Sequence, residues 1–348
     1  MDDAEVTSLL ESVTDPDLDG DIVSLGLVNN VEVRDGQARI SLALGTPYAP
    51  NESAIAERVR STLREAGLEP TISARYDRGP DGEDHPLSSV KNIIAVSSGK
   101  GGVGKSTISV NLAGALANMG ARVGLFDADI YGPDVPRMVG STERPKATAD
   151  EQLVPPEQYG IKLMSMAFLV GEDDPVIWRG PMVHKVLTQL WEDVAWGELD
   201  YLVIDLPPGT GDTQLTMLQT IPVTGAIIVT TPQQVAIDDA RRGLEMFGRH
   251  DTVVLGIVEN MRTFHCPDCG SAHDIFGTGG GEALAEDANL PFLGSIPLDP
   301  NVRTGGDEGR PIVLAEDSQT GAALRDLGEG VANQLGIVNR QAIQASDE

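Results

Sequence analysis

One stretch of the chain constrains its fold more than any other, the glycine-rich run Gly99-Lys100-Gly101-Gly102-Val103-Gly104-Lys105-Ser106-Thr107. It follows an apolar, β-branched run at 93–96 and precedes a stretch at 105–119 that is typical of a helix. A strand, a glycine-rich turn and a helix in this order predict a loop that cradles phosphate groups with backbone N–H donors. The glycines leave room for those donors, and the helix N-terminus adds a partial positive charge.

Two side chains at the end of this run complete the predicted site. The ammonium of Lys105 can reach the β- and γ-phosphate oxygens of a nucleotide, and the Ser106 hydroxyl can ligate Mg²⁺. We therefore expect ATP and Mg²⁺ as ligands, with the whole run from Gly99 to Thr107 contacting the nucleotide.

Carboxylates follow two other apolar strands. The run Leu125-Phe126-Asp127-Ala128-Asp129 ends one of them, and Tyr201-Leu202-Val203-Ile204-Asp205 ends the other. The carboxyl ends of parallel strands meet at one edge of a sheet, where phosphate sites also lie. We expect Asp205 to hold Mg²⁺ through water.

From residue 91 onward, apolar strands alternate with helical stretches, which predicts an α/β fold: a doubly wound, mostly parallel sheet with helices on both faces. The expected strands cover 91–97, 122–127, 200–205, 225–230, 252–258 and 292–296. The expected helices cover 105–119, 179–196, 211–220, 234–249, 280–289 and 318–335.

The pattern predicts four parts of the chain. A small α+β domain covers 1–78, a polar linker covers 79–90, the P-loop ATPase domain covers 91–335, and a polar, frayed tail covers 336–348.

The only two cysteines of the chain form a C-x-x-C turn, Cys266-Pro267-Asp268-Cys269. Such a turn supplies two thiolates, whereas a zinc site or a [4Fe–4S] cluster generally takes four protein ligands. A two-fold dimer would supply four. Two other interpretations stay open: a zinc site within one chain completed by His265 or His273, and a redox disulfide.

The charge of the chain argues against nucleic acid and anionic membranes as partners, because 53 acidic residues oppose 25 basic ones and give a net charge of −28. The N-terminus shows no signal segment, so we expect a cytoplasmic protein. Only six of the basic residues are lysines, a composition that resembles proteins of salt-loving archaea. We expect the fold to need molar salt, because the screening length falls from about 8 Å at 0.15 M to about 3 Å at 1 M and the repulsion among the acidic residues is then largely screened.

The loop G-K-G-G-V-G-K-S-T at 99–107 resembles the deviant P-loop of the ATPases of cell division, plasmid partition and the nitrogenase iron protein. The resemblance implies that Lys100 reaches across a dimer interface to the partner's nucleotide and acts in catalysis with Lys105. It also implies that Asp127 orders Mg²⁺-bound water and that Asp129 positions or activates the attacking water.

Several further runs resemble the Mrp/ApbC family of iron–sulfur carrier ATPases over about residues 88–335. They are the switch loop D-L-P-P-G-T-G-D at 205–212, the segment at 230–241 and the C-P-x-C turn at 266–269. The resemblance implies that Cys266 and Cys269 of two subunits share a labile [4Fe–4S] cluster. It also implies that Asn260 pairs with adenine and that the loop containing Pro297 closes over the base.

Residues 15–28 resemble the small domain of iron–sulfur maturation factors of the SufT kind. Such domains often carry a cysteine in a following T-P loop. Here that loop is Thr46-Pro47-Tyr48-Ala49-Pro50 and has none, which favours a docking or regulatory module.

Together these features predict a homodimeric carrier that passes clusters to apoproteins, works with cluster-assembly factors and couples transfer to ATP binding and slow hydrolysis. The alternative is a positioning switch similar to ParA and MinD, with a zinc-binding or idle cysteine pair. It predicts a basic surface or a basic amphipathic tail, and the sequence shows neither.

Overall fold

The computed structural model describes residues 1–76, 87–130, 132–150, 152–168 and 193–346. The predicted linker lies mostly outside these residues, and so does most of the helix predicted at 179–196. The chain divides into two compact units, which are taken one at a time: Met1–Pro80 with Val331–Glu348, and Asp81–Gly330. Within the described ranges, no helix combines the length and the apolarity needed to cross a bilayer.

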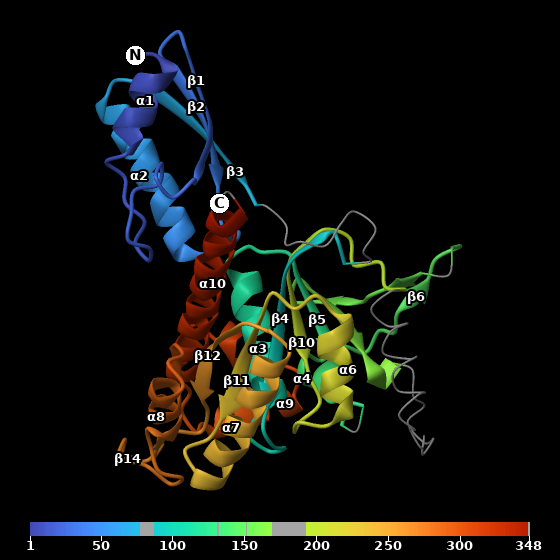
Figure 1. The fold of residues 1–348 in the computed structure, drawn as a ribbon. Helices are drawn as coiled ribbons and strands as arrows, with labels where there is room; N and C mark the ends of the chain where they lie inside the picture. The colour runs from blue at the N-terminus through green and yellow to red at the C-terminus, as the bar shows by residue number, and fades with distance from the viewer. Residues whose placement is uncertain (77–86, 131, 151, 169–192, 347–348) are drawn as a thin grey trace. The chain divides into compact units, whose positions relative to one another are not determined.

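An eight-stranded sheet organises the larger unit, and its central strands are labelled in Figure 1. The strand order is β15-β12-β11-β4-β10-β5-β9-β8. Every neighbouring pair is parallel except β8 and β9. The strands are β4 (Val90–Ser98), β5 (Val123–Asp127), β8 (Glu157–Gln158), β9 (Ile161–Ser165), β10 (Leu199–Asp205), β11 (Gly225–Thr230), β12 (Val254–Glu259) and β15 (Phe292–Ser295). The predicted mostly parallel sheet is confirmed, and β8 and β9 are additions that the sequence did not indicate.

The described residues of this unit contribute seven α-helices, and some of them pack directly on the sheet. They are α3 (Lys105–Asn118), α4 (Val135–Met138), α6 (Asp212–Thr220), α7 (Gln234–Arg249), α8 (Gly280–Asp287), α9 (Pro300–Asp307) and the first part of α10 (Gln319–Ser346). The chain moves from β4 toward β5 in one direction and from β10 through β11 to β15 in the other. Right-handed crossovers of opposite direction place their helices on opposite faces. The reversal at β4 opens a crevice at the carboxyl end of this strand.

The burial of each element explains its sequence. All seven residues of β10 are buried, which fits its near-continuous apolar run in the middle of a parallel sheet. Helix α3 is buried over ten of its fourteen residues, so it needs apolar side chains on most of its surface. Two short hairpins complete the unit: β6 (Lys146–Ala147) with β7 (Leu153–Val154), and β13 (Phe264–His265) with β14 (Ala272–His273).

The smaller unit is an α+β domain with a three-stranded sheet in the order β1-β2-β3. Its elements are α1 (Asp3–Leu10), β1 (Val28–Arg34), β2 (Gln37–Ala43), α2 (Pro50–Glu65) and β3 (Glu69–Arg75). A capping box between Asp2 and Glu5 starts α1. Apolar residues of α1, α2 and β2 form its core, among them Leu10, Ile40 and Ile55.

The end of the chain differs from the predicted frayed tail at 336–348. Helix α10 continues to Ser346, and its residues from Val331 onward belong to the smaller unit. The side chain of Arg340 is fully buried, with Nε 2.9 Å from Asp15 Oδ2 and one terminal nitrogen 2.6 Å from Asp17 Oδ2. Its other terminal nitrogen pairs with Glu52. The prediction was wrong because a polar stretch is exposed to solvent only when the fold offers its charged side chains no buried partners, and here Arg340 has three.

Candidate functional site

The glycine-rich loop joins β4 to α3 at the crevice. Gly102 and Gly104 have φ angles of 81° and 86°, in the left-handed region that glycine adopts without strain. A Cβ at Gly99 would lie 2.2 Å from the carbonyl carbon of Asp239 in α7, so this position has no room for a side chain. A Cβ at Gly101 would meet nothing within 4 Å, so this side of the loop faces open space where a phosphate can enter.

Asp205 gathers three side chains below the loop. Its Oδ2 lies 2.8 Å from the Lys105 ammonium and accepts a hydrogen bond of 2.6 Å from the Ser106 hydroxyl. Its Oδ1 accepts a hydrogen bond of 2.6 Å from Ser109. The structure therefore brings together residues predicted from two separate motifs, Lys105 and Ser106 of the glycine-rich run and Asp205 of the later strand. Ser109 was missed, although its position one turn after Lys105 places both on one helix face.

A second carboxylate lies beside Asp205, since Asp127 of β5 is its neighbour in the sheet register. Asp127 is fully buried and accepts a hydrogen bond of 2.8 Å from the Ser165 hydroxyl. Burial, followed by the negative charge of Asp205, holds the pKa of Asp127 well above its ordinary value. Asp129 is also nearly buried, with Oδ2 4.0 Å from the Lys105 ammonium.

This group fits Mg²⁺. Asp129 and Asp205 both lie within 4.0 Å of the Lys105 ammonium. Asp127 is the sheet neighbour of Asp205, so the site holds more acidic groups than one ammonium can balance, which favours a bound divalent cation. The oxygens of Ser106, Asp127 and Asp205 are ligands of the kind that Mg²⁺ takes, usually alongside substrate phosphates.

Gln214 of α6 was not predicted. Its amide nitrogen donates to Ser97 Oγ at 2.9 Å and to the Pro207 carbonyl at 2.7 Å. Its amide oxygen is buried and has no hydrogen-bond partner among the described residues. In the predicted switch loop, the backbone N–H of Gly209 donates to the Ser98 carbonyl at 3.0 Å. The switch loop is thus fastened to the end of β4.

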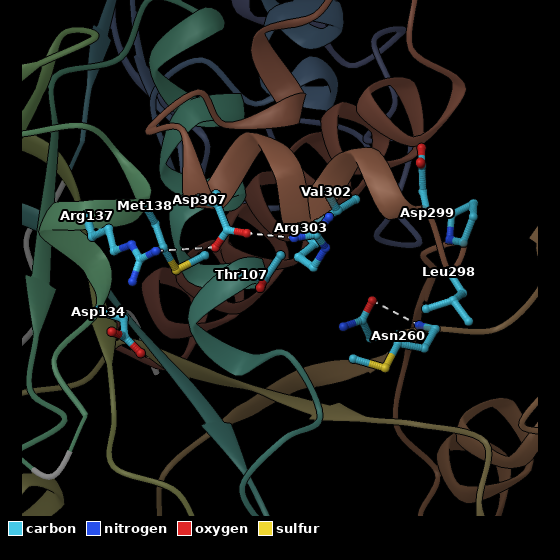
Figure 2. A pocket seen from close by; sticks show the side chains of 13 residues that line it. Thr107, Asp134, Arg137, Met138, Asn260, Leu298, Asp299, Val302, Arg303 and Asp307 are labelled. Atoms are coloured by element: carbon cyan, nitrogen blue, oxygen red, sulfur yellow. Dashed lines mark hydrogen bonds and ion pairs between the residues drawn. The ribbon is translucent and has the colours of Figure 1, made fainter.

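A cavity of about 320 Å³ lies next to the loop, between Thr107, α4, α9 and residues 297–299 (Figure 2). Both residues predicted to contact the base, Asn260 and Pro297, line it. The Asn260 amide nitrogen donates to the Val103 carbonyl at 2.8 Å, so this side chain also braces the phosphate loop. Its contact with adenine stays a prediction.

Charged side chains line the opposite wall of this cavity. Figure 2 shows the Asp307 carboxylate between two guanidinium groups, 3.7 Å from Arg137 and 2.9 Å from Arg303. Lys100, at the start of the phosphate loop, is half-buried. Its action on the nucleotide of a partner subunit stays a prediction.

The two cysteines lie on the hairpin of β13 and β14, and both are free thiols. The Cys266 N–H donates to the Ser271 carbonyl at 2.9 Å, and the Gly270 N–H donates to the Cys266 carbonyl at 2.8 Å. Cys266 is half-buried and Cys269 is exposed. The hydroxyl of Ser271, 3.2 Å from Cys269 Sγ, lowers the pKa of this thiol, with smaller contributions from the Ser271 N–H and the Cys266 side chain.

This arrangement suits metal binding, because the thiolate is the form that ligates a metal. Among the described residues, no third histidine, cysteine or acidic side chain joins the two thiols in a group that could hold a metal ion. In the structure the cysteine hairpin therefore offers two ligands, and neither His265 nor His273 joins them.

Comparisons with known proteins identify the family of this chain. A family model described as "NUBPL iron-transfer P-loop NTPase" matches residues 89–332, and one described as "Iron-sulfur cluster assembly protein" matches residues 3–72. A protein of Deinococcus radiodurans named iron-sulfur cluster carrier protein is 45% identical over 340 residues, covering 97% of this chain and 96% of that protein. A Synechocystis protein of the same name is 44% identical, covering 95% and 97%.

Solved structures add support at the level of the fold. A nucleotide-binding protein of Archaeoglobus fulgidus in complex with ADP is 40% identical, with a TM-score of 0.58, and covers 65% of this chain and 89% of that chain. MinD of Pyrococcus horikoshii complexed with Mg-ADP has a TM-score of 0.53 at 24% identity, covering 71% and 98%, and shows the fold alone. Since the first family model spans most of the sequence and includes the whole phosphate loop and the cysteine pair, the chain belongs to the NUBPL-type iron-transfer P-loop NTPases.

Proposed function

We propose that this protein carries iron–sulfur clusters to apoproteins and couples cluster transfer to the binding and slow hydrolysis of ATP. The observation that carries the proposal is the exposed hairpin with two free thiols, one of them with a lowered pKa, on a P-loop ATPase unit. The likeness to curated cluster carriers along nearly the whole chain supports it.

The buried group around Asp205 would bind the nucleotide. Ser106 would hold Mg²⁺ directly, and Asp205 and Asp127 would hold it through water; the ion supplies positive charge to the β- and γ-phosphates. Lys105, which pairs with Asp205 in the structure, would turn to the phosphate oxygens. Asp129 would orient the attacking water, and Lys100 would reach the nucleotide of a second subunit.

The cluster would be the cargo of Cys266 and Cys269. A [4Fe–4S] cluster is usually held by four thiolates, and one chain supplies two. Two hairpins facing each other across a two-fold axis would complete the set, so we propose a homodimer as the loaded form. The exposure of Cys269 would let client thiolates replace those of the carrier.

Anaerobic reconstitution tests the cargo. Iron, sulfide and zinc are counted per dimer in the full chain, in Cys266→Ala and in Lys105→Ala. We expect about four iron and four sulfide per dimer in the unaltered chain and none in Cys266→Ala. Lys105→Ala should still load a cluster, because this residue contacts no thiol.

A transfer assay tests the coupling. Cluster transfer to an apo-ferredoxin is followed with and without MgATP for the unaltered chain and Lys105→Ala. MgATP should change the transfer rate only in the unaltered chain. One zinc per chain and no sulfide would instead support the positioning switch, and equal transfer rates for both proteins would refute the coupling.

A further inference from the structure

The loop at residues 297–299 is a wall shared by two cavities. The first is the cavity of about 320 Å³ beside the phosphate loop, and the second, of about 330 Å³, is lined by His265, Cys266 and Pro267 of the cysteine hairpin. Residues 297–299 line both. A ligand in the first cavity therefore touches the same loop that borders the first cysteine.

The backbone ties this wall to the root of the cysteine hairpin. The Leu298 N–H donates to the Thr263 carbonyl at 3.0 Å, and the Arg262 N–H donates to the Ile296 carbonyl at 3.1 Å. Phe264 and Leu298 form a parallel bridge. These contacts extend the parallel pairing of β12 with β15 past the ends of both strands. A shift of the loop must therefore move the hairpin root or break these bonds.

The segment that leads to Cys266 begins at the phosphate loop. Asn260 is hydrogen-bonded to Val103, and Met261 follows with a φ of 58°, a left-handed conformation that is uncommon for a residue other than glycine. Such a conformation persists only where the surroundings hold it. Both residues line the first cavity, so a nucleotide would contact the start of this segment as well as the loop at residues 297–299 beside it.

The far end of the wall is anchored. The two oxygens of Asp299 accept hydrogen bonds of 2.8 Å, one from the Thr320 hydroxyl of α10 and one from the Asn301 N–H of α9. Movement of the loop is thus confined to the residues before Asp299. In Figure 2, Leu298 lies between Asp299 and Asn260 on the same side of the cavity.

We propose that Leu298 is a positioning residue that transmits nucleotide occupancy to the cysteine hairpin, so that filling the first cavity changes the reactivity of Cys266 and Cys269. This inference rests on the proposed function, since it takes the occupant to be a nucleotide and the cysteines to be the cargo site. A ligand shifts such an equilibrium only by its difference in affinity for the two loop positions. By reciprocity, occupancy of the cysteines changes nucleotide affinity by the same factor.

Thiol alkylation tests the proposal on the full-length, metal-free chain. The rate of reaction with iodoacetamide is measured for each cysteine by mass spectrometry, with and without saturating MgADP. We expect MgADP to change the Cys266 rate about fivefold, the effect of gaining or losing one backbone hydrogen bond. Leu298→Pro removes the N–H that bonds to Thr263, and Leu298→Ala removes the shared side chain but keeps that N–H. Both variants should bring the ratio of the Cys266 rates with and without MgADP toward one.

Val302→Ala is the matched control, because Val302 lines the first cavity and not the second. This variant should need more MgADP for saturation and then show the same rate ratio as the unaltered chain. Thermal melts identify a variant that fails to fold. If Leu298→Pro fails to fold, the result for Leu298→Ala decides the question.

The outcomes separate this inference from the proposed function. If MgADP binds and the chain loads a cluster but the rate ratio is one, this inference falls and the carrier function stands. If both Leu298 variants keep the full ratio, the path through this residue is refuted. If MgADP does not bind to the unaltered chain, both proposals fall.

Discussion

Replacing Arg340 with alanine should strongly lower the free energy of unfolding of the smaller unit. The guanidinium is fully buried and pairs with three carboxylates, and two of their residues, Asp15 and Glu52, are only 6% and 2% exposed. Removing one member of a buried ion pair costs about 3–5 kcal/mol, because the remaining charges stay buried without compensation. Burial already raises the pKa of Glu52, so this carboxyl can take up a proton and limit the loss to about 3 kcal/mol.

Hydrogen exchange measured by mass spectrometry resolves this effect by region. Peptides from α2 and β2 should exchange roughly 100-fold faster in Arg340→Ala at pH 7, and peptides from β4 and β10 should change little. Arg60→Ala is the control in the same unit, since its pair with Glu57 is partly exposed and such pairs contribute less than about 1 kcal/mol.

The loss of stability in Arg340→Ala should depend on pH. Without Arg340, the folded-state pKa of Glu52 rises further above its ordinary value of 4.5. A carboxyl with a raised folded pKa binds its proton more tightly in the folded chain, so the stability of the variant falls as pH rises through this window. The difference from the unaltered chain should therefore shrink at pH 4. Exchange in α2 within about fivefold of the unaltered chain at pH 7 would refute the reasoning.

Three further predictions follow from the sequence and the site. Ser271→Ala should raise the pKa of Cys269 toward 9.0, because the hydroxyl is the largest cause of its lowering; an unchanged midpoint in the alkylation rate against pH would contradict this. Gly99→Ala should cost about 1–3 kcal/mol in unfolding by calorimetry, since its Cβ would overlap the backbone of α7, whereas Gly101→Ala should cost little. With a net charge of −28, the melting temperature should rise steadily from about 0.15 M to 2 M KCl, and full stability in dilute buffer would exclude a need for salt.

Local sequence was enough to predict six of the eight strands of the large sheet, the phosphate loop and the acids at strand ends. A buried parallel strand needs a continuous apolar run, and a left-handed turn needs glycine. The few residues on either side were therefore enough to single out Gly102, Gly104 and Asp205. The C-x-x-C turn is similarly local. Each of these features depends on the backbone preferences or the chemistry of adjacent residues.

Contacts between distant segments were decided only by the tertiary structure. Ser109 meets Asp205 across 96 positions, Gln214 meets Ser97 across 117, and Arg340 meets Asp17 across 323. A serine, a glutamine or an arginine in a helix is compatible with solvent and with burial alike. What selects burial is a partner of matching charge or hydrogen-bonding capacity, and the fold alone brings that partner within 3 Å.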